Sequence, residues 1–91
     1  MATFAVMITF GDTALRDEVR PSHRVFLKEQ YDAGRLLESG PYVDDTGALL
    51  IYQGESEEAI RAIVATDPYA LNDGVIANLV VKEWNIVFPR K

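Results

Sequence analysis

The sequence predicts a ferredoxin-like βαββαβ fold, in which a four-stranded antiparallel sheet carries two helices on one face. Stretches with strand-like alternation and stretches with helical spacing follow one another in the order β-α-β-β-α-β. Turn-forming residues separate these stretches, and there is no internal repeat or linker. The chain has 91 residues, so we expect a single domain over residues 1–91.

The first strand and the first helix occupy the N-terminal third. A strand is expected over residues 3–10, because every second side chain is large and apolar and these side chains share one face. They are Phe4, Val6, Ile8 and Phe10. A turn at residues 11–13 then caps a short helical segment through Val19. Pro21 lacks an amide hydrogen, so it either starts a new helix or kinks a continuous one. That helix runs to Ala33, and Gly34 stops it.

The middle of the chain predicts a β-hairpin. The second strand is expected over residues 36–43, interrupted by Gly40 and Pro41. Residues 44–47 form a turn rich in Asp and Gly. The third strand, residues 48–53, is apolar on both faces.

The last third predicts a helix and a strand. Ser56 is a typical N-cap, and Pro68 ends the helix. Between them lies one apolar stripe made of Ala59, Ile60, Ile63 and Val64. After Gly74, the last strand is expected from Val75 to about Phe88.

An exposed apolar sheet face predicts self-association. Two helices can cover only one face of the sheet, yet the first and third strands carry apolar residues on both faces. A large uncovered apolar face would be a liability in water. We therefore expect a symmetric homodimer through the open sheet face.

Composition excludes several classes of partner and site. The net charge of −5 argues against nucleic acid, which requires clustered Lys and Arg. No apolar run approaches the roughly 20 residues needed to span a membrane, and no secretory signal starts the chain, so we expect a cytoplasmic protein. One histidine, no cysteine and no Gly-rich phosphate loop predict neither a metal site nor a bound cofactor.

His23 is the only imidazole in the chain and thus the obvious candidate for acid/base chemistry. On a helix starting at Pro21 it heads an otherwise largely apolar face that should rest on the sheet, shared with Phe26, Leu27, Gln30 and Tyr31. A buried, purely structural histidine would give the same pattern.

Asp67 is the expected partner of His23. It follows Ile63 by four residues and so continues the buried stripe of the second helix. A carboxylate that accepts one ring N–H fixes the histidine tautomer and leaves the other nitrogen as a base. The alternative is a turn role, because Asp before Pro often accepts hydrogen bonds from nearby amides.

Further residues are candidates for binding a substrate. Arg20 precedes His23 by three residues, so it projects from the same side of the helix, to bind an anion or to pair with Asp17. The segment Ser39-Gly40-Pro41 brings a strand backbone close to a ligand or marks a bulge. Tyr69 lines a pocket or belongs to the core.

The chain resembles the YciI-like (YCII-related) family of small dimeric α/β-barrel proteins. The resemblance covers nearly the whole chain and rests on four motifs in order: Val19-Arg20-Pro21-Ser22-His23 with Leu27, Gly34-Arg35-Leu36-Leu37-Glu38-Ser39-Gly40-Pro41, Ser56-Glu57-Glu58-Ala59, and Asp67-Pro68-Tyr69 with Gly74-Val75. It implies an active site built from His23 and Asp67, with Arg20 and residues 39–41 nearby. It also implies small-molecule substrates and no cofactor.

Two classes of function follow. The first is a cofactor-free enzyme, a lyase or isomerase, whose His23–Asp67 pair moves a proton of a small molecule during isomerisation or elimination. The alternative is a non-catalytic small-ligand binding or accessory module with the same pocket. Oxygen-dependent or haem chemistry is suggested only by analogy with other barrels.

Overall fold

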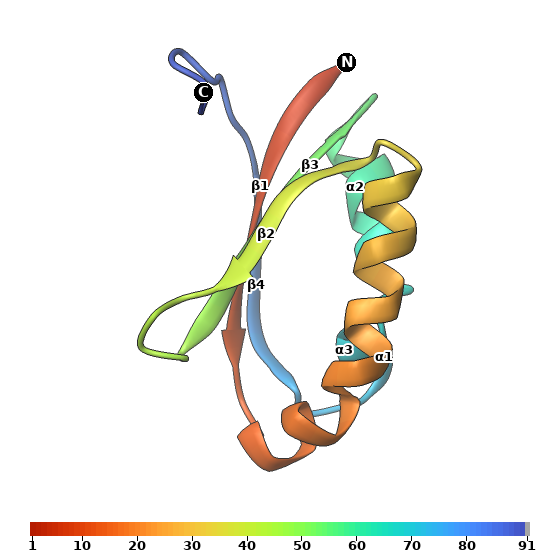
Figure 1. Ribbon diagram of the computed structural model, residues 1–91, viewed down its shortest axis with the longest axis vertical. Helices are drawn as coiled ribbons and strands as arrows, with labels where there is room; N and C mark the ends of the chain where they lie inside the picture. Colours follow the sequence, from red (N-terminus) through yellow and green to blue (C-terminus); the bar gives the residue numbers. More distant parts are fainter. Residues whose placement is uncertain (91) are drawn as a thin grey trace.

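The computed structural model describes residues 1–90, so Lys91 lies outside the described part of the predicted domain. It confirms the ferredoxin-like fold: one antiparallel sheet of order β2-β3-β1-β4, with the helices on one face (Figure 1). The elements in chain order are β1 Ala2–Phe10, α1 Thr13–Asp32, β2 Leu36–Pro41, β3 Gly47–Gly54, α2 Glu57–Val64, α3 Pro68–Leu71 and β4 Ile76–Glu83.

Helix α1 is one continuous helix with Pro21 inside it. It starts at Thr13, because the Asp12 side chain accepts a hydrogen bond from the Leu15 amide and caps the first turn. Of the two possibilities for Pro21, the continuous helix is therefore the one found. Gly34 follows the helix at a φ of +80°, a conformation that favours glycine.

Two strands are shorter than expected. Strand β2 ends at Pro41, and not at Val43, because the Tyr42 amide already donates to the Gly47 carbonyl in the hairpin turn. Strand β4 ends at Glu83, and not near Phe88. Its pairing with β1 ends at Phe4, opposite Glu83, and only one further backbone hydrogen bond follows, from the Trp84 amide to the Thr3 carbonyl at 2.8 Å.

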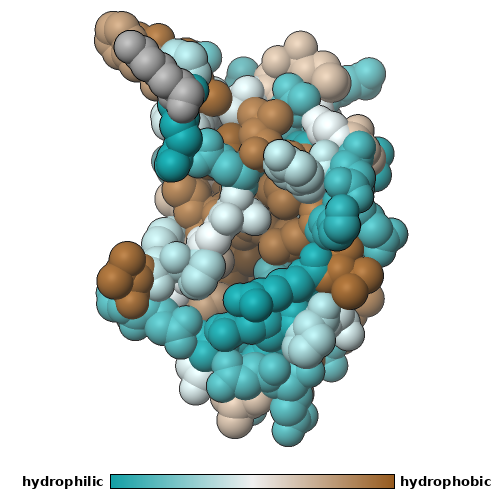
Figure 2. Space-filling view, in the orientation of Figure 1, coloured by the Kyte–Doolittle hydropathy of each residue, from teal (hydrophilic) through white to brown (hydrophobic). Residues whose placement is uncertain are grey.

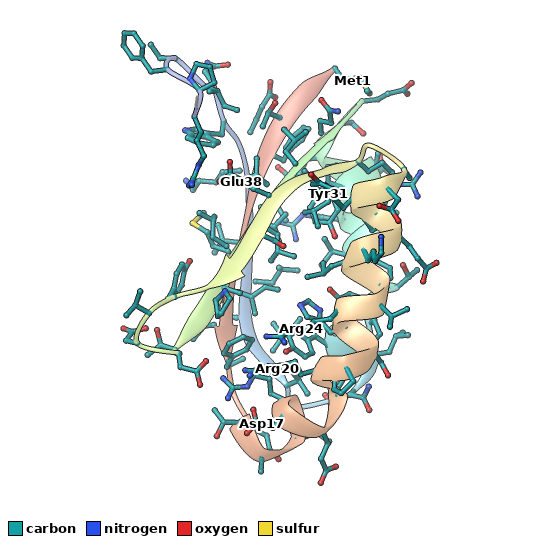
Figure 3. The ribbon with its side chains drawn as sticks, in the orientation of Figure 1. Met1, Asp17, Arg20, Arg24, Tyr31 and Glu38 are labelled. Atoms are coloured by element: carbon teal, nitrogen blue, oxygen red, sulfur yellow. The ribbon has the colours of Figure 1, made fainter. Side chains whose placement is uncertain are left out.

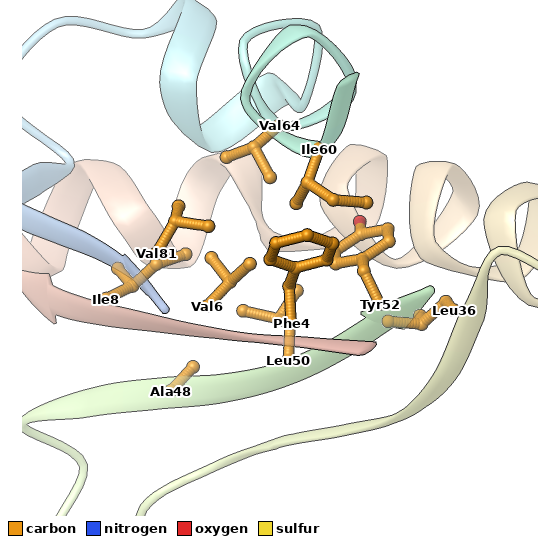
Figure 4. Packing of buried hydrophobic residues seen from close by; sticks show 10 residues of the cluster. All are labelled: Phe4, Val6, Ile8, Leu36, Ala48, Leu50, Tyr52, Ile60, Val64 and Val81. Carbon is orange, nitrogen blue, oxygen red and sulfur yellow. The ribbon is translucent and has the colours of Figure 1, made fainter. Parts of the chain in front are cut away.

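The core lies between the sheet and the helices (Figure 4). The central strands contribute most of it, and α2 closes it from above. Its buried members are Phe4, Val6, Ile8, Leu36, Ala48, Leu50, Tyr52, Ile60, Val64 and Val81. Helix α1 runs along the sheet beside β2, and its main contacts are with β2 and α3.

A short helix, α3, was not expected. The second helix was expected to run to Pro68, but α2 ends at Val64, and a non-helical turn separates it from Pro68. Pro68 begins α3, where its fixed φ suits the first helical position. Asp67 caps this turn through the Tyr69 amide. The single turn places Asp67 and Tyr69 against α1.

The other sheet face carries apolar side chains, and no helix or strand of residues 1–90 covers it (Figure 1). Leu49 is 37% exposed there, beside Ala5, Met7 and Ile51, and Trp84 stands at its border. No helix among residues 1–90 is both long and apolar enough to cross a membrane.

Candidate active site

His23 and Asp67 meet in the buried space between α1 and α3. The Nδ1 atom of His23 lies 2.7 Å from Oδ1 and 3.0 Å from Oδ2 of Asp67. The two side chains are only 8% and 2% exposed. At these distances the Nδ1–H donates to the carboxylate. His23 and Asp67, which are 44 positions apart in the sequence, are thus in contact as expected.

Asp67 has both of the roles that the sequence left as alternatives. Its Oδ1 accepts the Tyr69 amide at 2.9 Å while the same carboxylate accepts from His23. Capping α3 fixes the carboxylate, because the cap and the helix hold one another in place. The turn role is therefore what positions the carboxylate for the histidine.

Tyr69 holds the histidine ring from its face. The two rings stack with centroids 3.7 Å apart and planes 8° apart. Tyr69 also meets Phe10 edge to face at 5.8 Å, and it packs with Val19 and Val75. It belongs both to a small core cluster and to the lining of a pocket.

A cavity of about 230 Å³ opens in front of His23, between α1 and the edge strand β2. Figure 2 shows apolar surface in this hollow with hydrophilic side chains across its lower end. Six of the seven residues proposed for the site line it: Arg20, His23, Ser39, Gly40, Pro41 and Tyr69. Asp67 lies behind His23 and is not part of the lining.

The bulge expected at Gly40 is not there. Gly40 pairs regularly with Leu49, and the register shift of β2 falls earlier, between Leu36 and Glu38. Apart from Gly40 and its two chain neighbours, no residue of the described chain has an atom within 4 Å of the place where a Cβ of Gly40 would stand. Close packing within the chain is therefore not the reason for a glycine here.

Sequence reasoning missed Arg24 and the apolar floor of the cavity. Arg24 lies one turn after Arg20 on α1, and Figure 3 shows both side chains reaching from the helix toward the sheet. The four-residue spacing was a usable signal for it. The floor consists of residues from three elements, which no local pattern connects: Phe10, Leu27, Ala48 and Leu50.

The arrangement suits proton transfer at Nε2 of His23. Nδ1 is bonded to Asp67, and no described residue forms a hydrogen bond with Nε2. The carboxylate selects the tautomer with the proton on Nδ1, which leaves the Nε2 lone pair available. Within residues 1–90, no group of three His, Cys, Asp or Glu side chains is placed to hold a metal ion.

Comparison with known proteins places the chain among relatives of similar length. The model of the YCII-related domain matches residues 2–85. Protein YciI of Escherichia coli is 39% identical over 83 residues, covering 80% of this chain and 84% of that protein, and protein YciI of Shigella flexneri matches equally. A Haemophilus influenzae protein is 36% identical over 80 residues, covering 77% and 81%.

A solved structure shares the fold. The 5-chloro-2-hydroxyhydroquinone dehydrochlorinase of Burkholderia phenoliruptrix, in complex with 2,5-dihydroxybenzoquinone, superposes with a TM-score of 0.79. The match covers 91% of this chain and 93% of that one, at 22% sequence identity.

Proposed function

This chain belongs to the family of proteins with a YCII-related domain, and on that premise we propose that it is a cofactor-free enzyme. His23 is its general base and acid, and the reaction is an isomerisation or an elimination on a small molecule. Asp67 orients the histidine and stabilises the imidazolium that forms during the reaction. The main support for this proposal is the buried 2.7 Å contact between Nδ1 of His23 and the Asp67 carboxylate, together with the position of the histidine in the wall of a cavity.

The proposed mechanism begins when Nε2 of His23 takes a proton from a carbon or hydroxyl group of the substrate. The imidazolium that forms is stabilised by the adjacent Asp67 carboxylate. In an isomerisation, Nε2–H returns the proton to a different atom. In an elimination, the electron pair left by the proton forms a double bond as a leaving group departs.

The fold neighbour supports the second outcome. Its name describes the removal of hydrogen chloride from a chlorinated hydroxyhydroquinone, which is an elimination. Its complex with 2,5-dihydroxybenzoquinone supports the proposal that a protein of this fold can bind a small ring compound. Ser39, Gly40, Pro41 and Tyr69 would form the walls that orient such a compound.

We also propose that the working form is a homodimer in the cytoplasm. The support is the apolar sheet face around Leu49 and Met7, which carries no layer of its own. A second copy of the same face would cover it with two-fold symmetry.

The test is a screen for proton exchange and elimination. Small ring ketones and lactones are incubated with the protein in D₂O, and NMR follows the replacement of C–H by C–D. Release of chloride from 5-chloro-2-hydroxyhydroquinone is followed in parallel.

Replacing His23 by Ala should lower any activity found by roughly 10²- to 10⁴-fold, the usual worth of general acid/base catalysis. Activity retained within a few-fold would contradict the assignment. Ligand-dependent stabilisation without exchange or turnover would favour the binding-module alternative.

A further inference from the structure

We infer that the substrate is a compact organic anion. Its negatively charged oxygen, a carboxylate, phenolate or enolate, is held by Arg24 with help from Arg20, while its carbon frame lies on the apolar floor of the cavity. This inference rests on the proposed function, because it assigns the ligand of the same site. It adds the chemical class that the pocket selects.

The first support is the one-sided charge of the cavity. Two arginines line it, and none of its lining residues within the described chain is acidic. The whole chain carries a net charge of −5, so a positively charged cavity is opposite in sign to the chain as a whole. A concave site with charges of one sign raises the local concentration of the opposite ion.

The second support is the state of each arginine along α1. Arg16 is only 4% exposed and is fully engaged, with its guanidinium 2.8 Å from Asp17 and 2.9 Å from Asp45. Arg20 reaches the same two carboxylates only at 3.7 and 3.8 Å. Arg24 forms no ion pair with any residue in the part of the chain that the structure describes.

These differences rank the two pocket arginines. Asp17 and Asp45 lie closer to Arg16 than to Arg20, so they neutralise the charge of Arg20 only in part. They form no ion pair with Arg24, whose charge therefore stays uncompensated within the described chain. A guanidinium presents a planar fork of N–H donors that fits a carboxylate or another oxyanion. Arg24 is therefore the main anion ligand, and Arg20 is the second.

The remaining wall and the volume define the rest of the substrate. Leu27, Ala48 and Leu50 offer apolar surface, and about 230 Å³ suits a single ring or an equally small chain. A cation beside the base also favours proton removal, since it stabilises negative charge that develops on the substrate oxygen. The same positive charge of the arginines would thus favour both the binding of the substrate anion and the removal of its proton.

The experiment compares two probes of the same shape. Benzoate and neutral benzamide are titrated into the protein while NMR follows the ring signals of its single histidine. The wild type should bind benzoate more tightly than benzamide. Arg24→Gln should weaken benzoate binding roughly tenfold, the effect expected for one charge-assisted contact, and Arg20→Gln should weaken it less.

Arg61→Gln is the matched control. It also removes one helical arginine, but on α2, where Arg61 pairs with Glu57 at 2.9 Å. It should bind benzoate like the wild type. Equal affinity for the two probes, unchanged benzoate affinity in Arg24→Gln, or no benzoate binding up to roughly 10 mM would overturn the inference.

His23→Gln separates this inference from the proposed function. If both are right, the variant loses proton exchange but still binds benzoate within a few-fold, detected by backbone amide shifts. If benzoate selectivity is found in a protein that catalyses nothing, the function fails and the anion site stands. If His23-dependent turnover is found only with neutral substrates, the function stands and the anion site fails.

Discussion

At the scale of single residues, the central feature is how little freedom His23 has. Its Nδ1 edge is bonded to Asp67 and its face is stacked on Tyr69. A ring fixed on an edge and a face presents Nε2 in one direction, without a loss of rotational freedom when substrate arrives. Asp67 is fixed in turn, because it caps α3.

We predict that Asp67→Asn changes the tautomer of His23. The amide can still cap α3, since Asn is as good an N-cap as Asp. It loses the charge that holds the proton on Nδ1, so the proton should move partly to Nε2. Nitrogen-15 NMR of the single histidine resolves the two tautomers directly.

The control for this prediction is Asp12→Asn. Asp12 caps α1 through the Leu15 amide and lies outside the cavity lining. The same chemical change there should leave the His23 nitrogens as in the wild type. An unaltered tautomer in Asp67→Asn would show that the carboxylate does not select it.

We predict that Tyr52 makes the protein less stable at high pH. Burial, with the charge of Asp67 adding to it, raises the pKa of Tyr52 well above its usual value. Above about pH 10 the unfolded chain therefore loses this proton while the folded chain keeps it. The free energy of unfolding should then fall by about 1.4 kcal/mol per pH unit from this group.

Tyr52→Phe tests the effect. The hydroxyl has no hydrogen-bond partner in the described chain, so at pH 7 the variant should match the wild type within about 1 kcal/mol. Above about pH 10 it should become the more stable of the two in urea unfolding. If the free energies of unfolding of the two proteins run parallel up to pH 11, Tyr52 does not have this role. Tyr42→Phe, at an exposed tyrosine, is the control for loss of a hydroxyl.

At the scale of elements, the cavity depends on how α1 and the β2–β3 hairpin are joined. Arg16 on α1 pairs with Asp45 in the turn at 2.9 Å, and its guanidinium lies 4.7 Å from the centre of the Phe10 ring. Asp45 has a φ of +63°, which Asp and Asn tolerate better than most residues. One turn residue thus links the two walls of the cavity.

Asp45→Asn should loosen this link without straining the turn. The lost ion pair is buried on the Arg16 side only, so we expect the free energy of unfolding to fall by about 1 kcal/mol, as measured with urea. Asp32→Asn removes the solvent-exposed pair with Lys28 and should lower the free energy of unfolding by only a few tenths of a kcal/mol. Equal effects of the two changes would show that the turn is not fixed by this pair.

The elements show what could be predicted from the sequence and what could not. Strand alternation and helical spacing located every major element, because burial of one face imposes those periods. The His23–Asp67 contact was expected because Asp67 was placed on the buried stripe of the second helix. The contact is found, but Asp67 lies beyond the end of α2, at Val64, and reaches His23 as the N-cap of α3. The one-turn α3 was missed because Pro68 was taken only as a helix end, although proline also suits a helix start.

The site beyond the pair depends on contacts between distant segments. Arg24 lies on a solvent-exposed part of α1, and only the position of β2 makes it a cavity residue. Gly40 was expected at a bulge, and the shift occurs between Leu36 and Glu38 instead. The spacing from Arg20 could have indicated the helix face of Arg24, but the position of β2 and the place of the register shift have no local sequence signature.

At the scale of the whole molecule, the open sheet face predicts the oligomeric state. Replacing Leu49 by Asp puts a charge in the middle of the proposed interface, where burial would cost several kcal/mol. We expect this variant to be a monomer in sedimentation experiments in which the wild type is a dimer. Leu71→Asp, at a 69% exposed leucine on α3, should leave the dimer intact. A wild-type monomer, or a dimeric Leu49→Asp, would contradict the proposal.

The acid/base residues are buried, whereas part of the cavity wall belongs to an exposed edge strand, and this difference has an evolutionary consequence. His23, Asp67 and Tyr69 are buried, so most substitutions near them would cost stability. Residues 39–41 lie on an edge strand and are exposed, so they can vary at little cost. Drift along β2 would change which molecules fit while the proton-transfer apparatus stays constant. A lineage built on this scaffold can therefore acquire new substrates faster than it acquires new chemistry.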